Sequence, residues 1–167
     1  MSDPIVEAVQ AVIEAGEGEP LVAPDVVNEA MIRHWVEAFG DTNPAWRDAA
    51  ASPYGQVTAP PAMLGVWTME TSKNDGGPRD RAMRAVEAGG FLSVVATDYE
   101  TEFLRPLTLG TRLTELRSVE WIEGPKDTAL GTGYFVGTRY DYTDQDGELV
   151  GIARMKLLKF KPKNTHG

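Results

Sequence analysis

Three side chains in the segment FGDTNPAWRD, residues 39–48, have types and spacing that could hold a reacting water. Asp41 can accept hydrogen bonds from a water, and Asn43 lies two residues later. Trp46 cannot take up a proton, because its indole offers one N–H donor and no acceptor nitrogen. A lone carboxylate with an ordinary pKa of about 4 is a weak base, so a water held here lacks an efficient proton acceptor.

The same segment also fits ordinary turn chemistry. Asp41 follows a glycine at an expected helix end, and Asn43-Pro44 is a common turn pair. Trp46 is then a filler of apolar space. His34 flanks the apolar face of the preceding helix and His166 lies in the C-terminal tail, so neither is expected to replace a missing base.

Helical signals fill the first half of the chain. Asp3 and Pro4 suit the start of a helix over residues 3–15, and Asn28 can cap a helix that Gly40 closes. Between residues 60 and 72, two prolines precede an apolar series that predicts a third, largely buried helix. The polar, glycine-rich stretch 73–90 predicts an exposed excursion with a short helix inside.

Strand patterns fill the second half. The expected strands cover residues 91–107, 111–124, 129–144 and 148–162, separated by the turn sequences LTLG, EGPKD and DQDG. Asp146-Gly147 predicts a hairpin that pairs the last two strands antiparallel. Helices followed by an antiparallel sheet give an α+β fold, with the apolar helix from Pro60 expected to cover the inner face of the sheet.

Composition excludes several classes. The 167 residues suit one domain, and the charge of −9 opposes binding to nucleic acid. The chain has no cysteine, which rules out thiolate metal sites and a thiol nucleophile, and no metal-binding pattern is present. No apolar run reaches the roughly 20 residues of a membrane span, so we expect a cytoplasmic protein without a membrane partner.

The motif and its surroundings resemble the MaoC-like, type 2 enoyl-CoA hydratase family. That family has Gly-Asp-x-Asn-Pro followed two residues later by histidine; Asp41, Asn43 and Pro44 match, and Trp46 occupies the histidine position. The segments GQVTAPP, PPAML and FLRPLTLGTRL match further. The resemblance covers about residues 25–161, is strongest to the FAS1-like dehydratase N-terminal branch, and is especially strong to the non-catalytic subunits of heteromeric steroid side-chain hydratases of actinobacteria.

The resemblance implies a hot-dog fold, in which an antiparallel sheet wraps a long central helix and pairs with a second hot dog. Residues 1–24 would form an N-terminal helix and extended segment, 25–162 the hot-dog domain, and 163–167 a tail. Related subunits often carry a second, DUF35-type domain after a KFKP-like strand, and we expect that domain to be absent here.

The resemblance also implies a site. Asp41 would be a vestige of the catalytic pair, and an oxyanion donor would survive only if Ala62, not Pro61, occupies the family's glycine position, because proline has no N–H. The expected substrate contacts are Asn43, Trp46, Pro61, Ala62, Met63 and Trp67. The basic end KLLKFKPK is expected to be a solvated strand, or to face the phosphates of coenzyme A.

Three functions remain open. The first is a subunit of a heteromeric enoyl-CoA hydratase that is inactive alone, shapes a tunnel for a bulky or steroid acyl group, and depends on a MaoC-like partner with an intact Asp/His pair. The second is a non-catalytic acyl-CoA or steroid-binding module associated with an aldolase or thiolase, or with a DUF35-containing component. The third is a hot-dog thioesterase. None requires a cofactor beyond the coenzyme A of the substrate.

Overall fold

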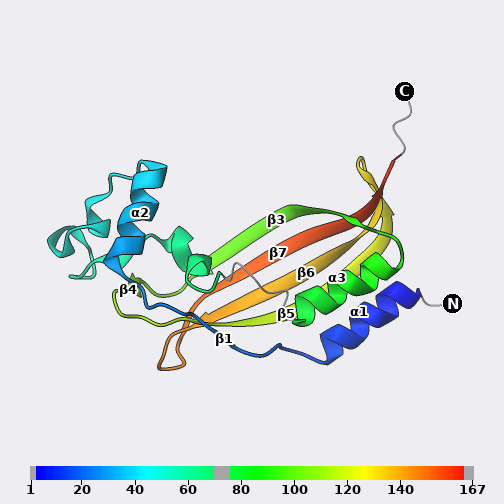
Figure 1. Ribbon diagram of the computed structural model, residues 1–167, viewed down its shortest axis with the longest axis horizontal. Helices are drawn as coiled ribbons and strands as arrows, with labels where there is room; N and C mark the ends of the chain where they lie inside the picture. Colours follow the sequence, from blue (N-terminus) through cyan, green and yellow to red (C-terminus); the bar gives the residue numbers. More distant parts are fainter. Residues whose placement is uncertain (1–2, 70–75, 164–167) are drawn as a thin grey trace.

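One strongly curved antiparallel sheet dominates the computed structural model, which describes residues 3–69 and 76–163 (Figure 1). Its strand order is β1-β5-β6-β7-β3, and a separate pair is formed by β2 and β4. The strands are β1 (Leu21–Val22), β2 (Thr58–Ala59), β3 (Ser93–Phe103), β4 (Leu107–Thr108), β5 (Thr114–Asp127), β6 (Gly131–Thr143) and β7 (Leu149–Pro162).

The four predicted strands are confirmed as β3, β5, β6 and β7, whereas the short strands β1, β2 and β4 were not predicted and β4 lies in the expected turn LTLG. The turn at Asp146-Gly147 joins β6 and β7, which pair antiparallel along almost their whole length. The segment EGPKD, expected to be a turn, instead lies within β5, where the pairing with β6 shifts register between Glu123 and Lys126. A bulge accommodates residues that cannot continue a regular ladder, so glycine and proline there do not end the strand.

Two helices cover one half of the inner face of the sheet. α1 (Pro4–Glu14) is capped by the Asp3 side chain, which accepts from the Ile5 N–H at 2.8 Å. α1 and α3 (Pro78–Ala88) lie side by side across the strands (Figure 1). Their buried residues form one core cluster with inward side chains of β5, β6 and β7: Val9, Ala82, Met83, Val86, Phe91, Val119, Tyr134, Val136 and Leu157. The predicted short helix is therefore confirmed, but α3 is part of the core and not an exposed excursion.

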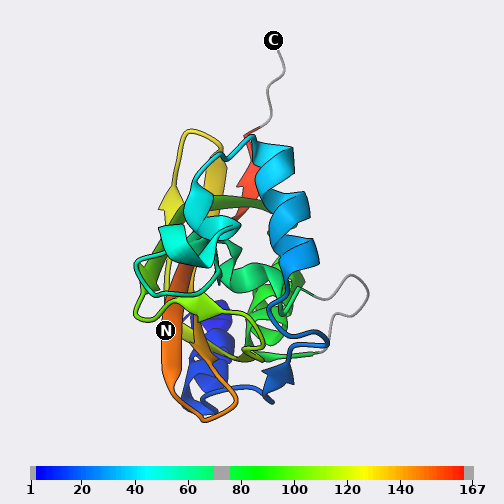
Figure 2. The same cartoon turned by 90° about the vertical axis from the view of Figure 1, so that its left-hand side faces the viewer.

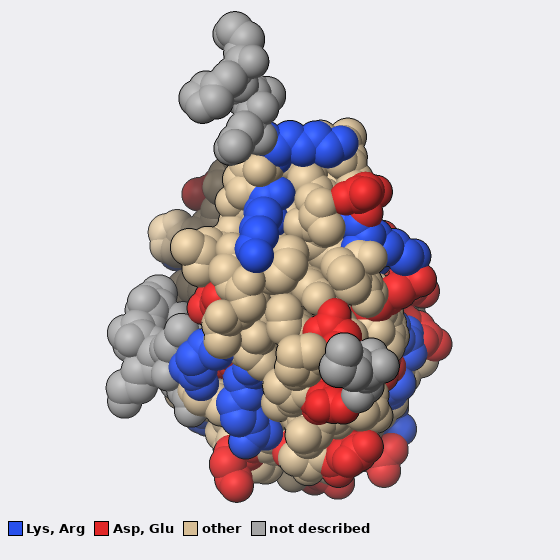
Figure 3. Space-filling model, turned by 90° about the vertical axis from the view of Figure 1, so that its right-hand side faces the viewer, with Lys and Arg blue, Asp and Glu red and all other residues tan. Residues whose placement is uncertain are grey.

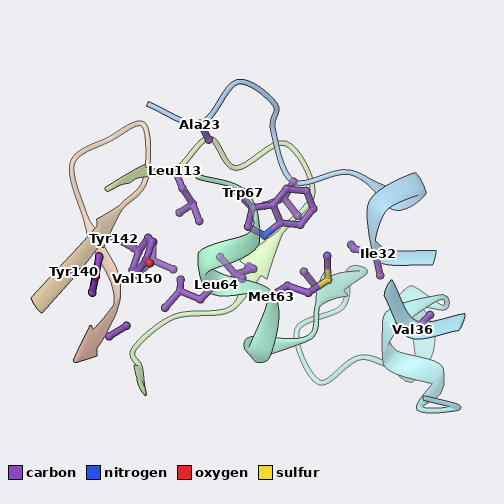
Figure 4. Packing of buried hydrophobic residues seen from close by; sticks show 14 residues of the cluster. Ala23, Ile32, Val36, Met63, Leu64, Trp67, Leu113, Tyr140, Tyr142 and Val150 are labelled. Carbon is purple, nitrogen blue, oxygen red and sulfur yellow. The ribbon is translucent and has the colours of Figure 1, made fainter. Parts of the chain in front are cut away.

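The other half of the same face is covered differently. α2 (Glu29–Phe39) and three 3₁₀ helices, η1 (Pro44–Trp46), η2 (Ala49–Ala51) and η3 (Pro61–Val66), gather at one end of the sheet (Figure 2). Met63 and Leu64 of η3, with Trp67 just after it, fill the space between α2 and the strands (Figure 4). Tyr140 and Tyr142 of β6 and Val150 of β7 contribute the sheet side of this second cluster.

The helix expected from Pro60 differs most from its prediction. The described part of this segment contains no α-helix; it forms η3, which is six residues long, and residues 70–72 of the expected helix lie outside the described residues. The apolar residues are buried as predicted, since Met63 is fully buried and Leu64 and Trp67 nearly so. The long central helix of the expected fold is thus replaced, between Pro61 and Trp67, by a single short helix.

Candidate functional site

The motif loop begins where α2 ends. Asn28 caps the helix by accepting from the Met31 N–H at 3.0 Å, and Gly40 ends it in the left-handed conformation with φ 65°. A side chain at this φ would be strained, which explains the glycine. The Asp41 N–H then donates to the Val36 carbonyl at 2.8 Å, which fixes Asp41 against the last turn of α2.

The Asp41 carboxylate is occupied by its own loop. One oxygen accepts from the Asn43 N–H at 2.9 Å, and the other accepts from the indole Nε1–H of Trp46, also at 2.9 Å. The Asn43 side chain in turn accepts from the Ala45 N–H at 3.1 Å and caps η1. The residue at the expected histidine position is therefore a donor that holds Asp41 as an acceptor. This pairing stabilises the loop, and the indole of Trp46 has no atom that can take up a proton from water.

No imidazole replaces the missing base in the described part of the chain. His34 is exposed on α2, whereas the Asp41 carboxylate accepts its hydrogen bonds from Asn43 and Trp46. His166 lies outside the described residues.

A first cavity, of about 410 Å³, lies beside the motif loop. Asn43, Trp46 and Pro61 line it, as do the end of β3 and the segment leading to β4. The other lining residues are Ala45, Pro53, Tyr54, Thr58, Ala59, Leu64, Phe103, Leu104, Arg105, Pro106, Leu107 and Val150. The cavity is mainly apolar, which suits an acyl group more than a polar metabolite.

A second cavity, of about 390 Å³, lies on the inner face of the sheet between the two core clusters. Its sheet side is formed by β3, β5, β6 and β7, and the residues are Tyr99, Glu115, Arg117, Tyr140, Tyr142 and Met155. η3 and the residues after it form another side, through Ala62, Gly65, Val66, Thr68 and Met69, and α3 contributes Arg79 and Asp80.

The residues expected to touch substrate therefore divide into three groups. Asn43, Trp46 and Pro61 line the first cavity and Ala62 lines the second. Met63 and Trp67 are core residues and line neither cavity. Pro61 opens η3 without an N–H, whereas Ala62 keeps one in the first turn, where helices lack internal acceptors.

Sequence reasoning missed a polar group in the second cavity. The Glu115 carboxylate is buried, and it accepts hydrogen bonds from the Thr68 hydroxyl and from Arg117 Nε. The signal was present in the alternation of β5, where Glu115 falls between the inward positions Leu113 and Val119. A charged residue at an inward strand position is rare without a partner or a function.

The basic end of the chain is largely engaged with its own sheet. Lys159 pairs with Glu87, the Lys161 ammonium lies 4.3 Å from the Phe91 ring centroid, and that of Lys156 lies 4.8 Å from the Phe135 centroid. On the face shown in Figure 3, basic side chains lie among acidic ones and do not merge into one patch. These contacts favour the solvated-strand interpretation over a phosphate site.

The described residues contain neither a candidate metal site nor a helix that could span a membrane. His, Asp and Glu side chains do not gather in a group that could hold a metal ion within residues 3–69 and 76–163. Over the same ranges, every helix is too short or too polar to cross a bilayer.

Comparison with known families identifies the chain. Residues 21–153 match the family described as FAS1-like, dehydratase domain region. The chain belongs to this family. Its motif loop carries Trp46, hydrogen-bonded to Asp41, at the position where the sequence resemblance implies a histidine.

Two curated relatives are hydratase subunits by name. The "Probable enoyl-CoA hydratase alpha subunit" of Thermomonospora curvata is 43% identical over 157 residues, which cover 89% of this chain and 49% of the relative. The "3-oxo-4,17-pregnadiene-20-carboxyl-CoA hydratase alpha subunit" of Mycobacterium tuberculosis is 39% identical over 169 residues, covering 96% of this chain and 53% of the relative. The chain thus spans about half the length of these relatives.

Solved structures agree with the fold. A chain in the crystal structure of the ChsH1-ChsH2 complex from Mycobacterium tuberculosis superposes with a TM-score of 0.91 and 36% identity, covering 97% of this chain and 94% of that chain. A MaoC-like dehydratase structure gives a TM-score of 0.63 at 22% identity, covering 92% of this chain and 44% of that one, which shows the shared fold alone. The predicted α+β hot-dog fold is confirmed, with the central helix shortened as described.

Proposed function

We propose that this member of the FAS1-like dehydratase region family is the non-catalytic subunit of a heteromeric enoyl-CoA hydratase with a bulky, steroid-like acyl substrate. The observation that carries the proposal is the hydrogen bond from Trp46 Nε1 to Asp41. A water that adds to the β-carbon of an enoyl thioester must lose a proton to a base, and this loop holds a donor where that base is needed. The partner subunit would supply the Asp/His pair.

The second cavity supports a role in holding the acyl group. Ligand pockets typically measure about 300–1,000 Å³, and the volume of about 390 Å³ between η3 and the sheet falls in this range. Its walls include the rings of Tyr99, Tyr140 and Tyr142. η3 is six residues long, and we infer that this short helix leaves room for a large acyl group.

The free edge of the sheet supports pairing with a partner. β3 is an edge strand, and several of its apolar side chains are exposed, including Val94 and Phe103. Unpaired edge strands present backbone N–H and C=O groups that can pair with another chain. If a partner subunit lies along β3, the acyl group of the substrate would enter the second cavity past Tyr99, which lies on that strand.

Reconstitution tests the proposal. The purified chain is expected to show no hydration of crotonyl-CoA or of a steroid enoyl-CoA. Co-expression with a MaoC-like subunit that carries an intact Asp/His pair is expected to give a complex that hydrates the steroid substrate. Turnover by a homogeneous preparation of the chain alone, lost in Asp41→Ala, would contradict it.

A cavity-filling variant tests the role of the second cavity. Ala62 is exposed and lines this cavity, so Ala62→Phe is expected to raise the KM of the complex for the steroid thioester but not for crotonyl-CoA. Ala11→Phe, at an exposed position on α1, is the matched control. Equal effects of Ala62→Phe on both substrates would count against the acyl site.

The same hydrogen bond also favours a second candidate, a non-catalytic acyl-CoA or steroid-binding module. This candidate predicts ligand binding by the chain and no hydration even when a competent MaoC-like subunit is bound. The reconstitution assay therefore separates the two functions.

A further inference from the structure

The second cavity has a mixed lining, in which the charged side chains of Arg79, Asp80, Glu115 and Arg117 accompany the tyrosine rings, and one end of it carries a buried polar cluster. Glu115, Thr68 and Tyr142, here called the Glu115 cluster, are all less than a twentieth exposed. Glu115 and Tyr142 are directly opposite each other in the β5–β6 ladder. The Thr68 hydroxyl reaches the Glu115 carboxylate from the segment after η3. Three different parts of the fold therefore place polar atoms at one point.

The position of the cluster matters because the cavity crosses the sheet. In the sheet order β5-β6-β7-β3, Tyr99 on β3 lies at one end of the cavity and Glu115 on β5 at the other. Met155 of β7 is paired with Tyr99 of β3. Tyr140 lies on β6, the strand between β7 and β5, and also lines the cavity. An acyl group that enters past β3 would bring the part remote from its thioester to the Glu115 cluster.

Part of the hydrogen bonding of the cluster is already committed. The Thr68 hydroxyl and Arg117 Nε both donate to the Glu115 carboxylate. Burial, together with the negative charge of Glu115, raises the pKa of Tyr142 above its ordinary value, which keeps the phenol protonated. Hydroxyls that donate to a carboxylate keep oxygen lone pairs free to accept.

We propose that the Glu115 cluster binds a hydroxyl group on the distal part of the acyl substrate. A hydroxyl can donate to the oxygen of Thr68 and can also accept a hydrogen bond, whereas a ketone in the same place can only accept. Space at this point is limited: a β-carbon added at Gly65 would lie 3.3 Å from the Tyr142 hydroxyl oxygen. The inference rests on the proposed function, since it requires the second cavity to hold the acyl group.

Three matched ligands test the proposal by calorimetry. They are saturated tetracyclic carboxylic acids with a hydroxyl, a ketone or only hydrogen on the ring farthest from the carboxyl group. The full chain, alone and co-purified with its catalytic subunit, is titrated with each. One well-made hydrogen bond in a buried site is expected to make the hydroxyl acid bind about tenfold tighter than the unsubstituted acid. The ketone acid is expected to bind less tightly than the hydroxyl acid.

Variants then assign the preference to the cluster. Tyr142→Phe and the nearly isosteric Thr68→Val are expected to reduce or abolish the preference for the hydroxyl acid while binding of the unsubstituted acid is retained. Tyr99→Phe, at the β3 end of the same cavity, is the control and is expected to leave the preference unchanged. Thermal unfolding of each variant verifies that it is folded, and Thr68→Val remains informative if Tyr142→Phe is not.

The outcomes separate the two proposals. Equal binding of all three acids, or tighter binding of the ketone, overturns the hydroxyl assignment and leaves the cavity as an acyl site. The hydroxyl assignment is also overturned if both Tyr142→Phe and Thr68→Val keep the wild-type preference for the hydroxyl acid. If none of the acids binds, and Ala62→Phe changes nothing, the acyl cavity itself is wrong and the inference falls with it.

Discussion

Replacing Asp41 should cost stability and not activity. The carboxylate accepts two hydrogen bonds, from the Asn43 N–H and from Trp46 Nε1, each at 2.9 Å. Asp41 is only partly buried, so each bond is assigned a net value of about 0.5–1.5 kcal/mol, and Asp41→Ala is expected to lower the free energy of unfolding by about 1–3 kcal/mol. For a domain of this size that corresponds to a fall in Tm of roughly 2–12 °C.

The assay compares stability and turnover in the same preparations. Chemical or thermal unfolding is measured on the isolated chain, and kcat and KM are measured on the reconstituted complex with a steroid enoyl-CoA. Asp41→Asn is the matched control: its side-chain oxygen can still accept one of the two bonds, so it should lose about half as much stability. Both variants are expected to keep the kcat of the wild-type complex.

The opposite pattern would refute this reasoning. Loss of a general base typically lowers the rate by about 10²- to 10⁴-fold. A fall of that size in kcat for both variants, with unfolding unchanged, would mean that Asp41 acts on the substrate and that its bond to Trp46 opens during the reaction.

Three further predictions follow from the fold. Burial and the hydrogen bond to Asp3 raise the pKa of Tyr134 from 10.0 to about 12. The Tyr134–Asp3 pair therefore stabilises the protein fully below pH 10, and its contribution is lost as the pH rises toward 12. Tyr134→Phe should flatten the dependence of the unfolding free energy on pH in that range. Val94→Lys, at an exposed position of edge strand β3, should weaken assembly with the catalytic subunit in size-exclusion chromatography. The control Leu130→Lys changes an exposed apolar residue in the β5–β6 turn and should leave assembly intact. Met63→Ala should lower the free energy of unfolding by about 2–5 kcal/mol in a denaturant titration, because Met63 is fully buried beside α2 and the sheet.

Local signals in the sequence were sufficient for most of the fold. Asp3 and Asn28 cap their helices as their residue types predict, and Gly40 ends α2 in the conformation that glycine favours. The Asp146-Gly147 turn sets the β6–β7 hairpin. Each of these depends on groups a few residues apart, so no knowledge of distant contacts is needed. The presence of Trp46 in place of the expected histidine was likewise readable from the sequence.

Other features depend on groups far apart in the chain. The apolar series after Pro60 predicts burial but cannot distinguish a long α-helix from a 3₁₀ turn, since both bury the same residues. α3 looked polar along the chain, yet its position beside α1 makes Ala82, Met83 and Val86 part of the core.

The sequence by itself determined the helix caps, the four long strands, the hairpin and the presence of an indole where a histidine was expected, because each can be read from neighbouring residues. Only the tertiary structure decided that Trp46 donates a hydrogen bond to Asp41, that the segment after Pro60 forms the short helix η3, and that Glu115 meets Thr68 across 47 positions of sequence. The first depends on the path of one loop, and the other two depend on how separate elements pack on one curved sheet. That packing sets which polar groups share a buried space, and no local pattern encodes it.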